Sequence, residues 1–247
     1  MNFHILTLFP EMFKGPFSES LLQKAQEKKI LLINLIDIRS FATDKHNKAD
    51  DTTYGGGPGM VMKLEPILKA IENISHNHKN PRIIFMTPSG EKFTQEKAKE
   101  LSMENNIVVL CGHYENIDQR ILENIVTDEI SMGDYVLTGG EIPAMALVDC
   151  VARLIPGVVK EEESVKNESF YDNLLDFPSY TKPEEYNGMK IPEMLKSGHH
   201  KKIREWRRKE SLKSTFFRRP DLLAKANLTK EDRKILEEII QNMGKEP

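Results

Sequence analysis

Apolar runs alternate with amphipathic stretches along the first two thirds of the chain. Runs rich in β-forming residues lie at 2–8, 30–38, 82–86 and 107–111, and the end of a fifth strand is predicted at 127–131. Helical patterns occupy 18–27, 63–74, 94–104, 116–123 and 144–154. This alternation predicts an α/β domain built on a parallel, buried sheet.

The helix predicted at 144–154 is apolar almost all round, with Pro143 in its first turn. A helix without a polar face is buried, either in a core or against another subunit. Gly133, Gly139 and Gly140 precede it, and we expect them to supply freedom in φ. The loop that they form has few reactive side chains, so it either contacts a ligand through its backbone or is an ordinary tight connection.

Three loops each follow a predicted strand, at residues 87–90, 112–115 and 131–143. The carboxyl ends of parallel strands meet at one edge of the sheet, where open α/β sheets bind their ligands. We therefore expect these three loops to converge on one site.

The pattern changes after the helix at 144–154. Residues 1–160 are predicted to form the α/β domain, and the acidic segment 161–175 reads as a linker or a mobile lid. From residue 173 onward we find helical patterns and no strand run, which predicts a small helical domain at 176–247.

Charge is distributed unevenly along the 247 residues. The net charge is −3, yet residues 196–219 hold ten Lys or Arg against two Glu. A basic block of this kind favours a polyanion partner, although a solvated helix face is the alternative. Trp206, the only tryptophan, lies inside the block, where it either stacks on an unpaired base or fills a small core.

No run of eighteen apolar residues and no signal-peptide pattern is present, so we expect a cytoplasmic protein without a membrane partner. Cys111 and Cys150 lack metal-type spacing, which predicts two buried thiols, no disulfide framework and no zinc site.

The glycine-rich stretch 54–60, YGGGPGM, matches none of the common nucleotide loops. No GK[ST] follows it, Met60 stands where a dinucleotide fingerprint needs Gly, and no apolar strand precedes it. The glycine loop of Rossmann-type methyltransferases is also missing after the first strand. What remains is a flexible loop beside Asp50 and Asp51, which either receives a base edge or a ribose or is a plain surface loop.

Five motifs in order carry a more specific signal: YGGGPGM at 54–60, GHYENID at 112–118, GDYVLTGGEIPAM at 133–145, ARLIPGV at 152–158 and SGHH..I..WR at 197–207. Together they resemble the bacterial tRNA (guanine-N(1)-)-methyltransferases of the knotted SPOUT class. The resemblance implies a homodimer whose parallel sheet domain contains a deep trefoil knot, an exception to the rule against threaded chains.

The same resemblance implies that S-adenosylmethionine binds between the three loops, and that the family's activity is associated with magnesium. Carried over by position, Glu115 stands near the cofactor and the target base. The other residues expected to line the cofactor pocket are Thr87, Pro88, Gly112, Tyr114, Ile130, Ser131, Tyr135, Leu137, Gly139, Gly140 and Pro143.

The implied substrate is the guanosine immediately 3′ of the tRNA anticodon. A carboxylate must accept the N1 proton, and an arginine near O6 stabilises the developing charge. The family's arginine matches Arg153, and its Asp-Ser-Phe base motif reads Glu168-Ser169-Phe170 here, with Glu163 and Asp172 as weaker candidates. The residues expected to contact tRNA are Asp50, Gly55, Pro58, Gly59, Ser197, His199, Lys201, Arg204 and Arg207.

Two other functions fit part of the sequence. A related knotted methyltransferase could modify another RNA position, and a non-catalytic RNA-binding protein could have kept the same fold. Glu168 and Arg153 argue against the second, because binding alone needs neither a base nor a group that stabilises charge on the base.

Overall fold

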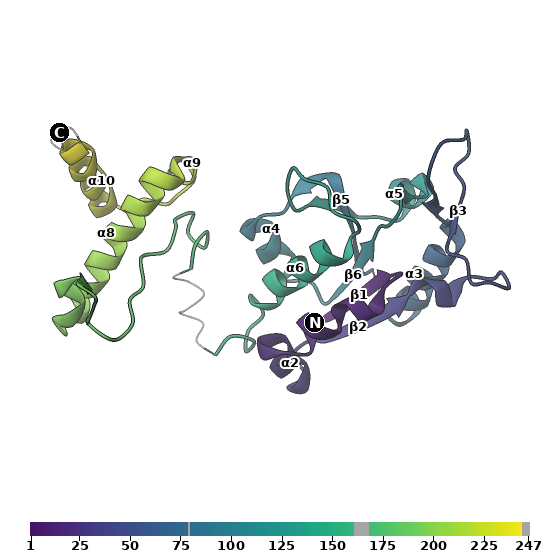
Figure 1. The fold of residues 1–247 in the computed structure, drawn as a ribbon, viewed down its shortest axis with the longest axis horizontal. Coiled ribbons are helices and arrows are strands. Elements are labelled where there is room, and N and C mark those ends of the chain that lie inside the picture. Colours follow the sequence, from purple (N-terminus) through teal and green to yellow (C-terminus); the bar gives the residue numbers. More distant parts are fainter. Residues whose placement is uncertain (79, 161–167, 244–247) are drawn as a thin grey trace. The chain divides into compact units, whose positions relative to one another are not determined.

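The computed structural model describes residues 1–78, 80–160 and 168–243. The chain divides into two compact units, Met1–Lys160 and Glu161–Pro247, which are described one at a time. The first unit contains the large sheet and its covering helices (Figure 1). Among the described helices, none is long and apolar enough to span a membrane.

The sheet of the first unit has five parallel strands in the order β2-β1-β6-β5-β8, which confirms the predicted parallel arrangement. The strands are β1 (Asn2–Thr7), β2 (Leu32–Asp37), β5 (Arg82–Lys92), β6 (Asn106–Cys111) and β8 (Asp128–Ser131).

Helices cover both faces of this sheet, because alternate residues of each central strand point to opposite sides. In β1, Phe3 and Ile5 belong to one apolar cluster and Leu6 belongs to the other. The first cluster is covered by α2 (Ser20–Glu27), α4 (Gln95–Leu101) and α6 (Glu141–Ala152), and the second by α3 (Leu64–Asn77) and α5 (Gln119–Asn124). The helices α4 and α6 pack side by side (Figure 1). Short helical segments complete the unit: η1 (Pro10–Phe13), α1 (Lys14–Phe17) and η2 (Ile38–Phe41).

The strand predicted at 82–86 is longer in the structure. There β5 continues to Lys92, and Ile130 of β8 pairs with both Met86 and Glu91. The four intervening residues leave the ladder and return to it, so they are an irregular excursion inside a strand and not a loop after one. Gly90 permits the return, because a Cβ there would lie 2.4 Å from the backbone of Glu129.

A second, three-stranded sheet carries the glycine-rich loop. Its order is β3-β4-β7, with β3 (Asp50–Asp51), β4 (Val61–Met62) and β7 (Asn116–Ile117). The predicted helix at 116–123 was therefore wrong in its first residues. Asp118 caps α5 by accepting a hydrogen bond from the Arg120 amide, so the helix begins only at Gln119.

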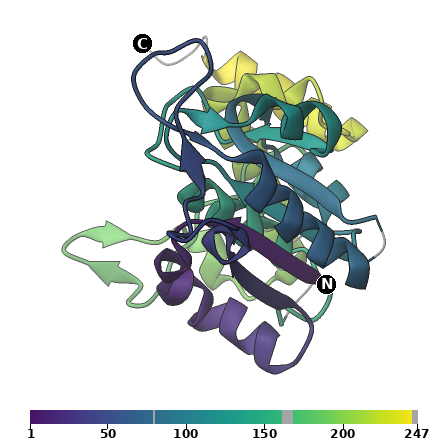
Figure 2. The same ribbon diagram turned by 90° about the vertical axis from the view of Figure 1, so that its right-hand side faces the viewer.

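The second unit contains three helices and a hairpin among its described residues. The helices are α8 (His200–Arg218), α9 (Pro220–Leu223) and α10 (Lys230–Met243), with a short η3 (Glu193–Lys196) before them. The strands β9 (Glu185–Tyr186) and β10 (Met189–Lys190) form a two-stranded ribbon (Figure 2), which corrects the expectation of no strand in this region. The missed signal is Asn187-Gly188, a pair typical of tight hairpin turns, and both residues have positive φ.

Part of the predicted linker, residues 161–167 with the candidate Glu163, lies outside the described residues. The following residues are bonded to the helices of the second unit. The amide of Leu175 donates to Thr215 Oγ1 of α8 at 2.9 Å, and Leu174 is buried. In the same unit, Arg208 donates two hydrogen bonds to the Asp232 carboxylate and so joins α8 to α10.

Candidate functional site

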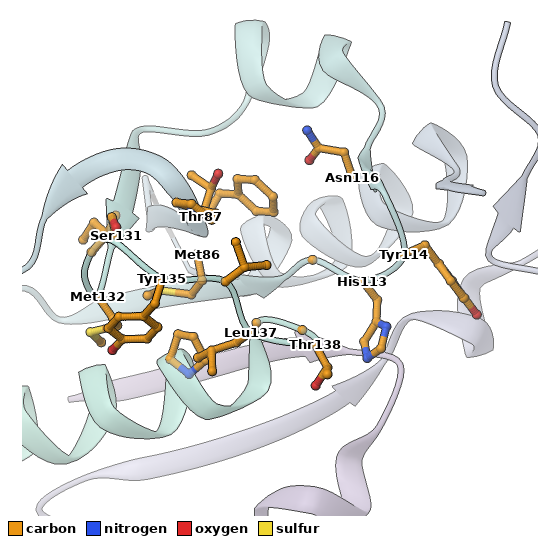
Figure 3. A pocket seen from close by; sticks show the side chains of 18 of the residues that line it. Met86, Thr87, His113, Tyr114, Asn116, Ser131, Met132, Tyr135, Leu137 and Thr138 are labelled. Atoms are coloured by element: carbon orange, nitrogen blue, oxygen red, sulfur yellow. The ribbon is translucent and has the colours of Figure 1, made fainter. Parts of the chain in front are cut away.

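The three loops singled out in the sequence surround one cavity at the carboxyl edge of the large sheet (Figure 3). Every residue expected to hold the cofactor lies on its wall: Thr87, Pro88, Gly112, Tyr114, Glu115, Ile130, Ser131, Tyr135, Leu137, Gly139, Gly140 and Pro143. The sheet explains this convergence, because β5, β6 and β8 are adjacent and parallel. β6 and β8 deliver their following residues to one edge, and the excursion 87–90 of β5 adds Thr87 and Pro88 to the same wall.

Close packing shapes the floor of the cavity where two of its loops meet. The amide of Gly140 donates to the carbonyl oxygen of Gly112 at 2.9 Å. A Cβ at Gly140 would lie 2.7 Å from Cα of Cys111, and one at Gly112 would lie 2.9 Å from the Phe85 ring. Gly140 has a φ of −81°, and neither Gly139 nor Gly140 has a positive φ. The expectation that this pair needs an unusual φ is therefore wrong. Only Gly133, with φ of +150°, fits that expectation.

The sequence reasoning missed several residues of the cavity wall: Phe85, Met86, His113, Asn116, Met132, Gly133, Val136 and Thr138. Most of them are direct neighbours of residues that were named, so adjacency along the same loops was the available signal. Tyr114 has a left-handed φ of 60°, and its half-exposed ring lies edge-on to the His113 ring, with 5.5 Å between the centroids (Figure 3). His113 lies on the wall together with Tyr114, although only Tyr114 was expected there.

Glu115 connects this cavity to the glycine-rich loop. Its amide donates to the carbonyl oxygen of Met60 at 3.1 Å, and a Cβ on Gly59 would lie 2.4 Å from Glu115 Oε1. Asp50 pairs with Met62 across β3 and β4, and the adjoining β7 continues directly from Glu115. Asp50, Gly55, Pro58 and Gly59 thus belong to a single excursion of the first unit that is tied to the cavity wall.

The second unit has a cavity of its own, with a volume of about 600 Å³. Glu168 and Asp172 lie on its wall together with Arg204, Arg207 and Arg208. The Arg207 guanidinium packs over the Phe177 ring at 4.7 Å. Of the other predicted tRNA contacts, Ser197, His199 and Lys201 are exposed and lie before or in the first turn of α8. Carboxylates and guanidinium groups thus share one cavity.

Arg153 does not line the cavity of the first unit. It follows the last residue of α6, whereas Gly140 precedes the first. Twelve helical residues span about 18 Å at about 1.5 Å per residue. The structure of one chain therefore does not bring Arg153 to the residues expected to hold the cofactor.

Three further expectations concern the aromatic and sulfur side chains. Trp206 is half-buried, and its ring centroid lies 6.5 Å from that of Tyr180, so it is less buried than the core alternative implies. Stacking on an unpaired base stays a prediction. Cys111 is buried, and burial raises the pKa of its thiol, with the charge of Glu141 adding to the effect. Cys150 is only partly buried, which corrects its prediction.

In the described part of the chain, no group of three or more His, Cys, Asp or Glu side chains is arranged to hold a metal ion. Among the described residues, Glu115 is the one carboxylate on the wall of the first cavity. The described residues thus contain no preformed cluster of ligands for magnesium.

The fold and this cavity define an α/β protein with a cavity at the carboxyl edge of a parallel sheet, between loops rich in glycine. A family model described as tRNA (Guanine-1)-methyltransferase TrmD matches residues 1–225. The chain belongs to this family, as the sequence motifs indicated.

Similar proteins extend over almost the whole chain. A tRNA (guanine-N(1)-)-methyltransferase of Alkaliphilus oremlandii is 54% identical over 245 residues, covering 97% of this chain and 98% of the relative. Proteins with the same description from Desulforamulus reducens and Carboxydothermus hydrogenoformans are 55% and 56% identical. They cover 98% and 96% of this chain, and 96% and 92% of the relatives respectively.

Proposed function

We propose that this protein transfers a methyl group from S-adenosylmethionine to N1 of the guanosine immediately 3′ of the tRNA anticodon. The observation that carries the proposal is the convergence of all twelve expected cofactor residues on one cavity, in a chain that belongs to the tRNA (Guanine-1)-methyltransferase family. S-adenosylmethionine supplies an electrophilic methyl carbon on its sulfonium.

The cavity wall fits such a cofactor. Gly112 and Gly140 have no room for a Cβ, against the Phe85 ring and the Cys111 backbone respectively, so a flat ring can lie close to the main chain. Ile130, Leu137 and Pro143 provide apolar contacts, while Glu115 favours a positive charge. The volume is about 230 Å³, below the roughly 300 Å³ at which pockets for drug-sized ligands begin. Part of the bound cofactor would therefore remain open to the second substrate.

Glu168 is the proposed proton acceptor for guanine N1. Its carboxylate shares a cavity with Arg204 and Arg207, on a basic unit suited to the tRNA backbone. Removal of the N1 proton leaves negative charge on the base, and Arg153 is proposed to stabilise that charge near O6. No step of this mechanism passes through magnesium.

We also propose that the active form is a homodimer containing the knotted fold of the class. The exposed apolar surface of the first unit supports a partner: Val136 is 84% exposed, and Ile142 on α6 is 52% exposed. Because Arg153 lies at the far end of α6 from its own cavity, it would serve the cavity of a second chain. Sedimentation of the wild type and of Ile142→Glu tests this, and a monomeric, active wild type would contradict it.

The decisive experiment for the reaction is transfer of a labelled methyl group to tRNA transcripts with and without guanosine 3′ of the anticodon. Nucleoside analysis then locates the label. We expect 1-methylguanosine only in the first transcript. Equal labelling of both would favour a related enzyme that modifies another position, and no labelling with intact tRNA binding would favour a non-catalytic RNA-binding protein.

A further inference from the structure

Glu141 is a buried carboxylate directly behind the wall of the cofactor cavity, and the proposed reaction gives it no role. It is the first residue of α6 and is only 1% exposed. It is not among the residues of the cavity wall. Burying a carboxylate is costly unless hydrogen bonds and charges compensate for the lost water. The contacts of Glu141 therefore need an explanation.

One carboxylate oxygen is held by the end of β1. Thr7 Oγ1 donates a hydrogen bond to Glu141 Oε1 at 2.7 Å, and both side chains are buried. The same hydroxyl accepts the amide of Phe9 at 2.9 Å, which fixes its direction. Oε1 is thereby anchored to the central part of the large sheet.

The other oxygen faces the two cavity loops. Glu141 Oε2 lies 3.8 Å from Nε2 of His113, within the range of an ion pair. A Cβ on Gly139 would lie 2.5 Å from this oxygen and 2.8 Å from the His113 ring. The His113 ring also packs against Phe9, with 4.7 Å between the ring centroids. Gly139 is thus enclosed between the carboxylate and the imidazole.

We infer that Glu141 is a positioning residue, which holds His113 and Gly139 in the arrangement that receives S-adenosylmethionine. The inference rests on the proposed function, because it assumes that the cavity binds this cofactor. The amino end of α6 stabilises the negative charge. A loop held in its bound arrangement before the ligand arrives loses less entropy on binding.

Calorimetry with S-adenosylmethionine and no tRNA tests the inference on the full chain. Glu141→Ala should raise Kd about tenfold or more, because His113 and Gly139 lose their common support. Glu141→Gln can still accept the hydrogen bond from Thr7 and should recover much of the affinity. Methyl transfer at saturating cofactor should remain close to the parental rate in both variants, so the defect appears in KM and not in kcat.

Thr7→Val provides a second, independent route to the same contact. It should weaken cofactor binding, and combining it with Glu141→Ala should add little, because both changes disrupt one arrangement. If Glu141→Ala does not fold, Glu141→Gln and Thr7→Val still carry the test: the first should bind nearly as well as wild type and the second more weakly.

Leu101→Ala is the matched control. Leu101 is fully buried in the apolar cluster that α6 helps to cover, and it does not line the cavity, so its truncation should lower Tm and leave Kd unchanged. The inference is overturned if Glu141→Ala and Thr7→Val behave like Leu101→Ala, with lower Tm and unaltered Kd. Absence of binding by the wild type would instead remove the proposed function, and this inference with it.

Discussion

The amide of Gly140 donates a hydrogen bond to the carbonyl oxygen of Gly112 at 2.9 Å and so joins two loops that are 28 positions apart in the sequence. One loop follows β6 and the other precedes α6. At this bond the two backbones lie so close that Gly140 tolerates no side chain, and a Cβ on Gly112 would meet the Phe85 ring. The shape of the cavity therefore depends on backbone contact more than on reactive groups.

Gly140→Ala should raise Kd for S-adenosylmethionine by about tenfold or more, equivalent to about 1.4 kcal/mol. The added Cβ would lie 2.7 Å from Cα of Cys111 and must displace one of the loops. Gly15→Ala is the control, since a Cβ there meets nothing within 4 Å. Calorimetry on both variants checks this, and equal affinities would show that the contact is not part of the cofactor site.

Glu168→Gln should slow methyl transfer by roughly 100 to 10,000-fold, the usual contribution of a general base. Gln keeps the size of the side chain and its hydrogen bonding, so binding of both substrates should change little. Glu168→Asp should retain some activity if the chain can move to close the gap of one methylene group. Asp172→Asn, on the wall of the same cavity, is the matched control.

Single-turnover rates at saturating cofactor and tRNA, measured across pH, separate the chemical step from binding for these variants. A parental rate for Glu168→Gln together with a slow Asp172→Asn would transfer the role of the base to Asp172. Parental rates for both would point to Glu163.

Charge reversal at Lys201, Lys202 and Arg204 should weaken tRNA binding and flatten its dependence on salt. Removing one bond to a phosphate reduces the slope of log K against log salt by about 0.7 to 0.9, because fewer counterions are released on binding. All three side chains are on α8 and are exposed. Reversal of the exposed Lys24, Lys28 and Lys29 in the first unit is a control with the same change of charge. Equal slopes for the two triple variants would identify the α8 surface as merely solvated.

His4 should make the protein sensitive to acid. Burial lowers the pKa of His4 from 6.5 to about 4, and the charge of His78, whose ring lies 4.7 Å away, adds to this. The unfolded chain therefore binds an extra proton between pH 6.5 and about 4. Stability is full above pH 6.5 and falls as the pH drops through this window.

Chemical denaturation of the wild type and His4→Leu between pH 4 and 7 measures this effect. The variant should lose much of the dependence on pH, whereas a variant of the exposed His46, His46→Asn, should keep it. Parallel curves for wild type and His4→Leu would assign the acid sensitivity to other groups. Asn34 contacts His4 Nδ1 at 3.5 Å and carries no charge, so it does not confound the result.

Local patterns in the sequence determined the strands of the large sheet and the edge at which its ligand site forms. Continuous apolar runs such as 107–111 mark strands buried on both faces, and such strands are parallel in α/β proteins. Thr94 specified the start of α4, since its hydroxyl accepts the Lys97 amide in the structure. The order of strands and loops along the chain was sufficient to place three loops at one edge.

Tertiary structure alone decided the contacts between segments distant in the sequence. The strands β4 and β7 have two residues each, too few for a pattern, yet their pairing connects the glycine-rich loop to Glu115. Residues 87–90 look like a turn, but hydrogen bonding to β8 resumes beyond them and keeps them inside a strand.

Glu141 is a single side chain whose position in a helix follows from the sequence but whose surroundings do not. An acidic residue in the first turn of a helix is ordinarily an exposed group that favours the amino end of the helix. Here Thr7 and His113, from two distant parts of the chain, enclose it together with the nearby Gly139. Periodicity and local propensity report how a residue relates to its neighbours in sequence. Burial and partners depend on which distant segments pack against it, and only the folded chain decides that.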